Sequence, residues 1–105
     1  MQIQFNSDSR IEGGADTAEA VEARIRERLS RFEARLTRIE VHVGDVDGDR
    51  NGPRGVEAKI EARPAGDRPV VVTDRAADAK GAIAGALGKL VALLDTHFSK
   101  ADAVR

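Results

Sequence analysis

Two segments of strictly alternating polarity flank a turn-rich loop, and this arrangement limits what the chain can fold into. Residues 38–43 and 56–63 alternate apolar and polar side chains with a period of two, which predicts strands with one buried and one solvated face. The loop between them, residues 45–55 (DVDGDRNGPRG), has the Gly, Asp and Asn content typical of turns. The two segments therefore predict an antiparallel hairpin whose outward face is charged.

Other segments complete a two-layer architecture. The predicted elements are strands at residues 2–6, 38–43, 56–63 and 69–73, a turn at residues 64–67, and helices at residues 16–36 and 77–100. This order predicts an α+β fold, β-α-β-β-β-α, in which two long helices cover one face of a mostly antiparallel four-stranded sheet. At 105 residues, we expect a single domain that spans residues 1–105.

Local signals set the predicted limits of the two helices. Asp16 and Glu19 resemble a capping box that begins the first helix, and residues 102–105 are expected to fray at the end of the chain. Three glycines lie inside the second helical pattern: Gly81, Gly85 and Gly88. Each costs about 0.5 to 1 kcal/mol relative to Ala, so we expect close packing contacts to compensate.

The composition excludes several classes of protein. Three Phe and no Trp or Tyr predict an aliphatic core and argue against RNA recognition on an exposed aromatic platform. The absence of cysteine excludes disulfides, thiolate ligands and a catalytic thiol. The first residues do not resemble a signal peptide and no apolar run has membrane-spanning length. We therefore expect a soluble cytoplasmic protein.

Patterns of catalytic or metal-binding residues are missing from the sequence. Four loop residues match the start of a calcium-binding loop: Asp47, Asp49, Asn51 and Gly52. The pattern requires a glutamate at residue 58, where the chain has Ala58. His42 and His97 lack a metal-ligand spacing, and no serine elbow or phosphate-cradling glycine loop occurs. We expect no enzymatic activity, no metal site and no cofactor.

The charges of the predicted helices are sorted laterally, although the formal net charge is only -1. Four arginines form one stripe beside the apolar face of the first helix: Arg24, Arg28, Arg31 and Arg35. The stripe fits a phosphate-binding edge, or a solvated surface with i,i+4 pairs such as Glu27 with Arg31. Lys89 and Lys100 lie on one flank of the second helix and Asp95 on the other. Two cationic edges favour phosphate binding.

Runs in four parts of the chain resemble one family. They are MQIQ at the start, LSRFEARLTRIEVHV at residues 29–43, EARPAGDRPVVVTD at residues 61–74 and AIAGALGKLVALLD at residues 82–95. Together they resemble the short form of the bacterial ribosome hibernation promoting factor, a family that includes the ribosome-associated inhibitor of stationary phase. The resemblance covers nearly the whole chain in order and implies the same β-α-β-β-β-α fold.

The resemblance also implies a function. Members bind the small ribosomal subunit in the channel of mRNA and tRNA, block translation and preserve idle ribosomes. Short forms lack a further carboxy-terminal dimerisation domain and favour ribosome dimers with a separate ribosome modulation factor. The matching candidates for rRNA contact are Arg28, Arg31 and Arg35, with Arg24 as a neighbour, and Lys89 and Lys100. Where similar members often carry further basic residues, this chain has Ala92, Thr96 and Phe98.

The sequence therefore leaves two classes of function open. The first is a non-enzymatic translation inhibitor that binds rRNA through the two cationic helix edges. The second is a diverged protein-interaction module that keeps the fold without binding rRNA, including self-association through the exposed sheet face or an edge strand. The missing basic residues of the second helix motivate this alternative. An enzyme is disfavoured because no pair of nucleophile and base can be named.

Overall fold

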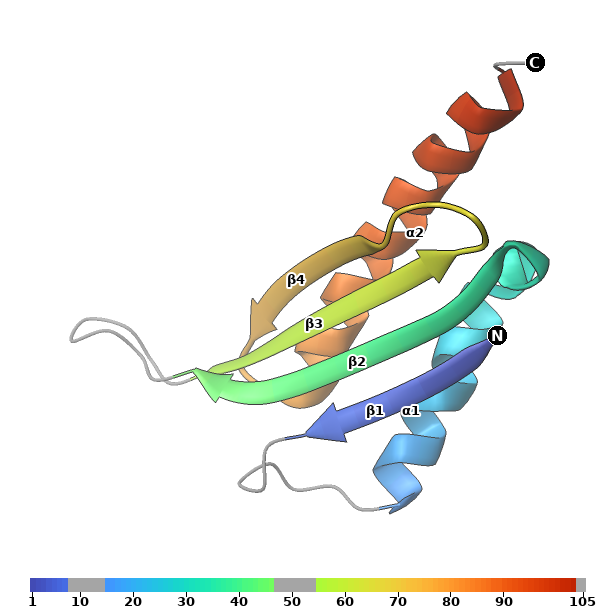
Figure 1. The fold of residues 1–105 in the computed structure, drawn as a ribbon. Helices are drawn as coiled ribbons and strands as arrows, with labels where there is room; N and C mark the ends of the chain where they lie inside the picture. The colour runs from blue at the N-terminus through green and yellow to red at the C-terminus, as the bar shows by residue number, and fades with distance from the viewer. Residues whose placement is uncertain (8–14, 47–54, 104–105) are drawn as a thin grey trace.

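A computed structural model describes residues 1–7, 15–46 and 55–103 of the chain (Figure 1). The elements are β1 (Gln2–Ser7), α1 (Ala15–Arg28), the 3₁₀ helix η1 (Ser30–Arg35), β2 (Leu36–Val46), β3 (Gly55–Pro64), β4 (Val70–Ala76) and α2 (Ala79–Ala103). The strands form one sheet in the order β1-β2-β3-β4, in which β1 runs parallel to β2 and the other neighbours are antiparallel. The predicted fold class is confirmed.

The helices cover one face of the sheet and enclose an aliphatic core (Figure 1). The period of two places Ile39 and Val41 of β2 on the covered face, opposite Ala62 and Ile60 of β3. The largest fully buried side chains are Ile25, Leu29, Ile39, Val41, Ile60, Leu87, Leu90 and Leu94. Burial of each such side chain contributes about 1.5 to 3 kcal/mol relative to exposure, so these residues hold the helices to the sheet.

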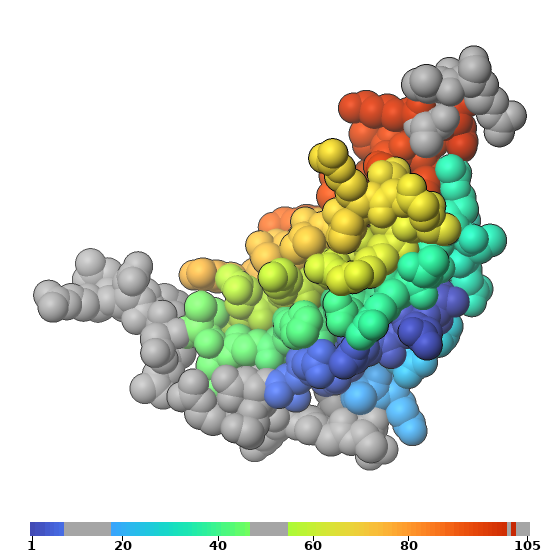
Figure 2. Space-filling view, in the orientation of Figure 1, coloured from blue at the N-terminus to red at the C-terminus, as the bar shows by residue number. Residues whose placement is uncertain are grey.

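No helix of the described residues covers the opposite face of the sheet (Figure 2). This face carries charged side chains, as predicted. Arginine–glutamate ion pairs of the described residues on this face join Arg38 with Glu40 (2.9 Å), Arg63 with Glu61 (2.8 Å) and Arg75 with Glu57 (3.0 Å). These pairs neutralise much of the charge that the alternating strands place in water.

The first helix ends earlier than the sequence predicts. We expected one α-helix to about Leu36, but α1 ends at Arg28, η1 follows, and Leu36 begins β2. The amide of Phe32 donates to the carbonyl of Leu29 (2.9 Å), three residues back, which is the 3₁₀ pattern. Apolar spacings of three and four residues fit both kinds of helix. The tighter turn also brings Phe32 against α2, where its ring centroid lies 5.5 Å from that of Phe98.

Several predicted limits shift by a few residues. β2 continues to Val46 and β3 begins at Gly55, so the hairpin loop is shorter than predicted, and α2 continues to Ala103. Fraying from residue 102 is therefore wrong for Asp102, because this residue is helical and binds Arg35. α1 begins one residue before Asp16. The side chain of Asp16 and the calcium-like residues 47–54 lie outside the described part of the structure.

Two of the three glycines in α2 permit close contacts. A Cβ atom on Gly85 would overlap the carboxylate of Asp74 in β4, with Cγ at 2.8 Å. A Cβ atom on Gly81 would lie 3.0 Å from Ala76 Cβ. By contrast, nothing lies within 4 Å of a Cβ on Gly88. The predicted compensation by packing is therefore confirmed for Gly81 and Gly85 and wrong for Gly88.

This difference predicts opposite effects of two matched substitutions. Gly88→Ala should raise the free energy of unfolding by about 0.5 to 1 kcal/mol, because Ala gains helix propensity in open space. Gly85→Ala should lose that gain, since the new methyl displaces the Asp74 carboxylate from Lys89. Urea unfolding of both variants measures the contrast. Equal stabilisation by the two substitutions would contradict the close approach of α2 to β4.

Candidate nucleic-acid interface

Arg24 and Arg28 form an exposed cationic pair on α1. They lie one turn apart on the same side of the buried Ile25, as the helical spacing predicts. Among the described residues, no carboxylate forms an ion pair with either guanidinium. Arg26, on another side of the helix, pairs with Glu22 at 3.1 Å and lies 3.8 Å from Glu33. Arg24 and Arg28 therefore present positive charge to solvent.

Arg31 and Arg35 lie on η1 and turn toward α2. The Nη2 atom of Arg31 lies 2.6 Å from Oδ2 of Asp95. Arg35 donates one hydrogen bond from each Nη atom to the two carboxylate oxygens of Asp102, both at 3.2 Å. The four predicted arginines thus do not form a single α-helical stripe. Arg31 of η1 pairs with Asp95 of α2 instead of with Glu27 of α1.

Two phenylalanine rings support these guanidinium groups. Arg31 Cζ lies 4.7 Å from the ring centroid of Phe32, and Arg35 Cζ lies 4.0 Å from that of Phe98. Both distances are within the range of cation–π attraction. Phe98 is one of the positions at which the family resemblance implies a further basic residue; in the structure it is buried beneath Arg35. Nothing in the sequence indicates that Arg35 lies over Phe98, because this contact crosses from η1 to α2.

The predicted lysines lie on the other flank of α2. Lys89 donates to the carbonyl of Thr73 (2.9 Å) and to Asp74 Oδ1 (3.3 Å), both in β4. Lys100 is exposed, and no described carboxylate pairs with it. Asp95 faces η1, where it pairs with Arg31, whereas Lys89 faces β4. The arginines of η1 therefore lie on one side of α2, and the lysine edge of α2 lies on the other. The structure therefore does not bring the six predicted cations into one patch.

A histidine joins α2 to the turn between β3 and β4. Nε2 of His97 lies 2.9 Å from Oδ2 of Asp67, beside Gly66, whose φ of 70° permits the tight turn. The backbone amide of Arg68, with a smaller contribution from His97, lowers the pKa of Asp67. The backbone amide of Arg75 is the main cause that lowers the pKa of Asp74, and Lys89 adds to it.

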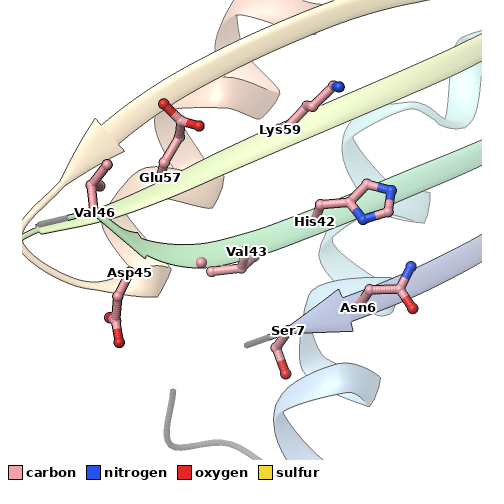
Figure 3. Close-up of a pocket in the computed structure, with 9 residues that line it drawn as sticks. Asn6, Ser7, His42, Val43, Asp45, Val46, Glu57 and Lys59 are labelled. Atoms are coloured by element: carbon pink, nitrogen blue, oxygen red, sulfur yellow. The ribbon is translucent and has the colours of Figure 1, made fainter. Parts of the chain in front are cut away.

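A shallow hollow of about 390 Å³ lies on the uncovered face of the sheet. Figure 3 shows Asn6, His42 and Lys59 on adjacent strands at this hollow, and the strand register places them in one row. Glu57, also at the hollow, pairs with Arg75. Within residues 1–7, 15–46 and 55–103, no group of three His, Cys, Asp or Glu side chains could hold a metal ion.

None of the described helices is long and apolar enough to span a membrane.

Comparisons with known proteins agree with the fold. The sequence profile of the family described as "Sigma 54 modulation protein / S30EA ribosomal protein" matches residues 10–101. A ribosomal subunit interface protein from Coxiella burnetii is similar in structure, with a TM-score of 0.70, 13% identity, and 94% of this chain and 99% of that chain covered. The N-terminal domain of Thermus thermophilus Protein Y matches with a TM-score of 0.70, 22% identity, and 92% and 99% coverage. No curated protein sequence matches the chain significantly.

The lowered pKa of Asp74 predicts a specific acid sensitivity. Because folding lowers this pKa, the stabilisation is present above the ordinary value of 3.8 and is lost as the pH falls through the lower folded value. Asp74→Asn should therefore reduce the loss of unfolding free energy between about pH 5 and about pH 2. Urea unfolding across this pH range measures the loss of unfolding free energy. Lys89→Gln should keep most of the acid loss, since the Arg75 amide is the main cause, and an unchanged profile in Asp74→Asn would refute the assignment.

Proposed function

Because the chain belongs to the Sigma 54 modulation protein / S30EA ribosomal protein family, we propose that it is a ribosome-associated, non-enzymatic inhibitor of translation. The resemblance to short hibernation factors is confirmed by this membership. In the proposed function, the protein binds small-subunit rRNA in the channel of mRNA and tRNA and stabilises inactive ribosomes in the cytoplasm under stress or in stationary phase. A ribosome modulation factor is a further proposed partner.

The observation that carries the proposal is the exposed pair of Arg24 and Arg28. These two guanidinium groups lie one turn apart on a helix that the aliphatic core holds rigidly against the sheet. Among the described residues, no carboxylate pairs with them. Clustered arginines without partners suit the phosphate backbone, because each contact releases counterions and adds to affinity. Together with Arg31 and Arg35 on η1, they form the proposed principal rRNA contact.

Lys89 and Lys100 form a second, separate contact in this proposal. They lie on the flank of α2 that faces β4, away from η1. An rRNA channel surrounds its occupant, so phosphates can approach both flanks of the helical layer. Lys89 must exchange its contact with Asp74 for a phosphate, and its exposed side chain permits this.

A protein-interaction module is the second candidate function. Three of the six predicted cations, Arg31, Arg35 and Lys89, already pair with aspartates of the chain. Leu93 on α2 and Val71 on β4 are large apolar side chains that are 42% and 45% exposed. Recovery of one protein and no rRNA in a pull-down from stationary-phase lysate would favour this alternative.

Charge reversal of the arginine pair tests the proposed rRNA contact. Arg24→Glu with Arg28→Glu should weaken binding to isolated small subunits by about tenfold or more. It should also reduce the slope of log affinity against log salt by about 1.5, since two phosphate contacts are lost. Cosedimentation at several salt concentrations measures both quantities.

A matched control makes the same charge change elsewhere. Lys59→Glu with Arg75→Glu alters two exposed residues of β3 and β4 on the uncovered face of the sheet, away from the helical layer. This control should bind small subunits with nearly the affinity of the unsubstituted protein. If the two double variants weaken binding equally, the effect is one of net charge and the proposed surface is wrong.

A further inference from the structure

We propose that Arg31 and Arg35 form a preorganised clamp for two phosphate groups of RNA, and that Asp95 and Asp102 occupy the clamp until RNA displaces them. The name "arginine clamp" refers here to Arg31 and Arg35 with the supporting rings of Phe32 and Phe98. The inference rests on the proposed function, because it assigns a means of regulation to the same cationic edge.

Aromatic rings hold the guanidinium groups independently of the aspartates. Phe32 and Phe98 are 5% and 7% exposed, and their ring centroids lie 5.5 Å apart. Arg31 lies over the first ring and Arg35 over the second. While the rings support the guanidinium groups, Nη atoms of both arginines still donate to carboxylates, so these N–H groups are available to an anion. The arginines therefore keep their position when a carboxylate leaves.

The aspartates bind as phosphates would. Asp102 accepts one hydrogen bond on each oxygen from the two Nη atoms of Arg35, which is the bidentate geometry that phosphate also adopts with arginine. Asp95 accepts a short hydrogen bond of 2.6 Å from Arg31. The two aspartates are seven residues apart on α2, or about 10.5 Å along the helix axis. The clamp therefore takes two separate phosphate groups and not two oxygens of one.

Exchange of carboxylate for phosphate is easy at this surface. The side chains are 58% and 47% exposed in the Arg31–Asp95 pair and 41% and 55% exposed in the Arg35–Asp102 pair. Solvent and salt screen exposed pairs of this kind, and they contribute little to stability. A nucleic-acid strand gains counterion release at each contact, whereas an isolated anion does not. The aspartates thus exclude weak monovalent anions and admit a dense polyanion.

The arrangement also accounts for a low net charge in an RNA-binding protein. The chain carries a formal charge of -1, which limits indiscriminate attraction to nucleic acid. The aspartates on α2 lower affinity for any RNA, so tight binding requires a target that contacts the exposed Arg24 and Arg28 as well as the clamp. The clamp thereby favours a shaped rRNA surface over free RNA.

Neutralising the aspartates tests the clamp. Asp95→Asn with Asp102→Asn should tighten binding to small subunits about 2- to 20-fold and should steepen its salt dependence, because the arginines no longer have competing carboxylates. Binding of poly(U) RNA should tighten as well. Thermal unfolding checks that the double variant folds. Asp95→Asn alone removes one of the two competing carboxylates and should tighten binding less. Binding to both ligands is measured over the same series of salt concentrations.

Two matched variants separate the clamp from net charge. Glu22→Gln with Glu33→Gln also removes two carboxylates, but it frees Arg26, which lies outside the clamp. This control should tighten binding much less. Arg31→Lys with Arg35→Lys keeps the charge and loses the bidentate, ring-supported geometry, so it should weaken binding.

The outcomes distinguish the clamp from the proposed function. Equal tightening by the aspartate and glutamate variants overturns the clamp and leaves the proposed function standing. The same holds if the aspartate variant does not tighten binding while Arg24→Glu with Arg28→Glu weakens it as expected. Tightening on poly(U) without any binding to small subunits supports the clamp and refutes the ribosomal function. Binding to neither ligand by any of the variants overturns both.

Discussion

The apolar face of α2 on the sheet determines where every charge of the helical layer lies. Leu87, Leu90 and Leu94 are fully buried, and Gly85 lets the helix approach β4 closely. Because these contacts set the rotation of α2 about its axis, one flank faces β4 and the other faces η1. Rotation by a fraction of a turn would separate both sets of charged partners and remove the support that Phe98 gives to Arg35.

The charge sorting of α2 has a structural role that a helical wheel alone does not reveal. Its acidic flank binds the arginines of η1, and its basic flank binds aspartates of β4 and of the turn before it. These ion pairs are exposed, so each contributes little to stability. Their larger effect is on the availability of cations. Arg24 and Arg28 are exposed and pair with no carboxylate of the described residues, while Arg31, Arg35 and Lys89 are held by carboxylates.

Sequence periodicity was sufficient for the strands and insufficient for the end of the first helix. In β2 and β3 the period of two has one interpretation, since a slip of one residue would move Ile39 and Val41 into water. From Leu29 to Leu36, the spacing of apolar residues fits an α-helix and a 3₁₀ turn equally. The choice depends on where α2 offers Phe98 to Phe32, a contact between residues 66 positions apart. The four arginines were therefore predicted as one stripe, but the structure divides them between α1 and η1.

The sequence by itself determined the order of elements, the aliphatic core, the charged outer sheet face and the family to which the chain belongs. Local periodicity and ordered sequence runs carry this information, because they depend on neighbouring residues. Only the tertiary structure decided which aspartates hold Arg31, Arg35 and Lys89, and that the two cationic edges lie on opposite flanks of α2. Those outcomes depend on through-space contacts between elements, whose relative rotation is set by core packing and not by the pattern of any single segment.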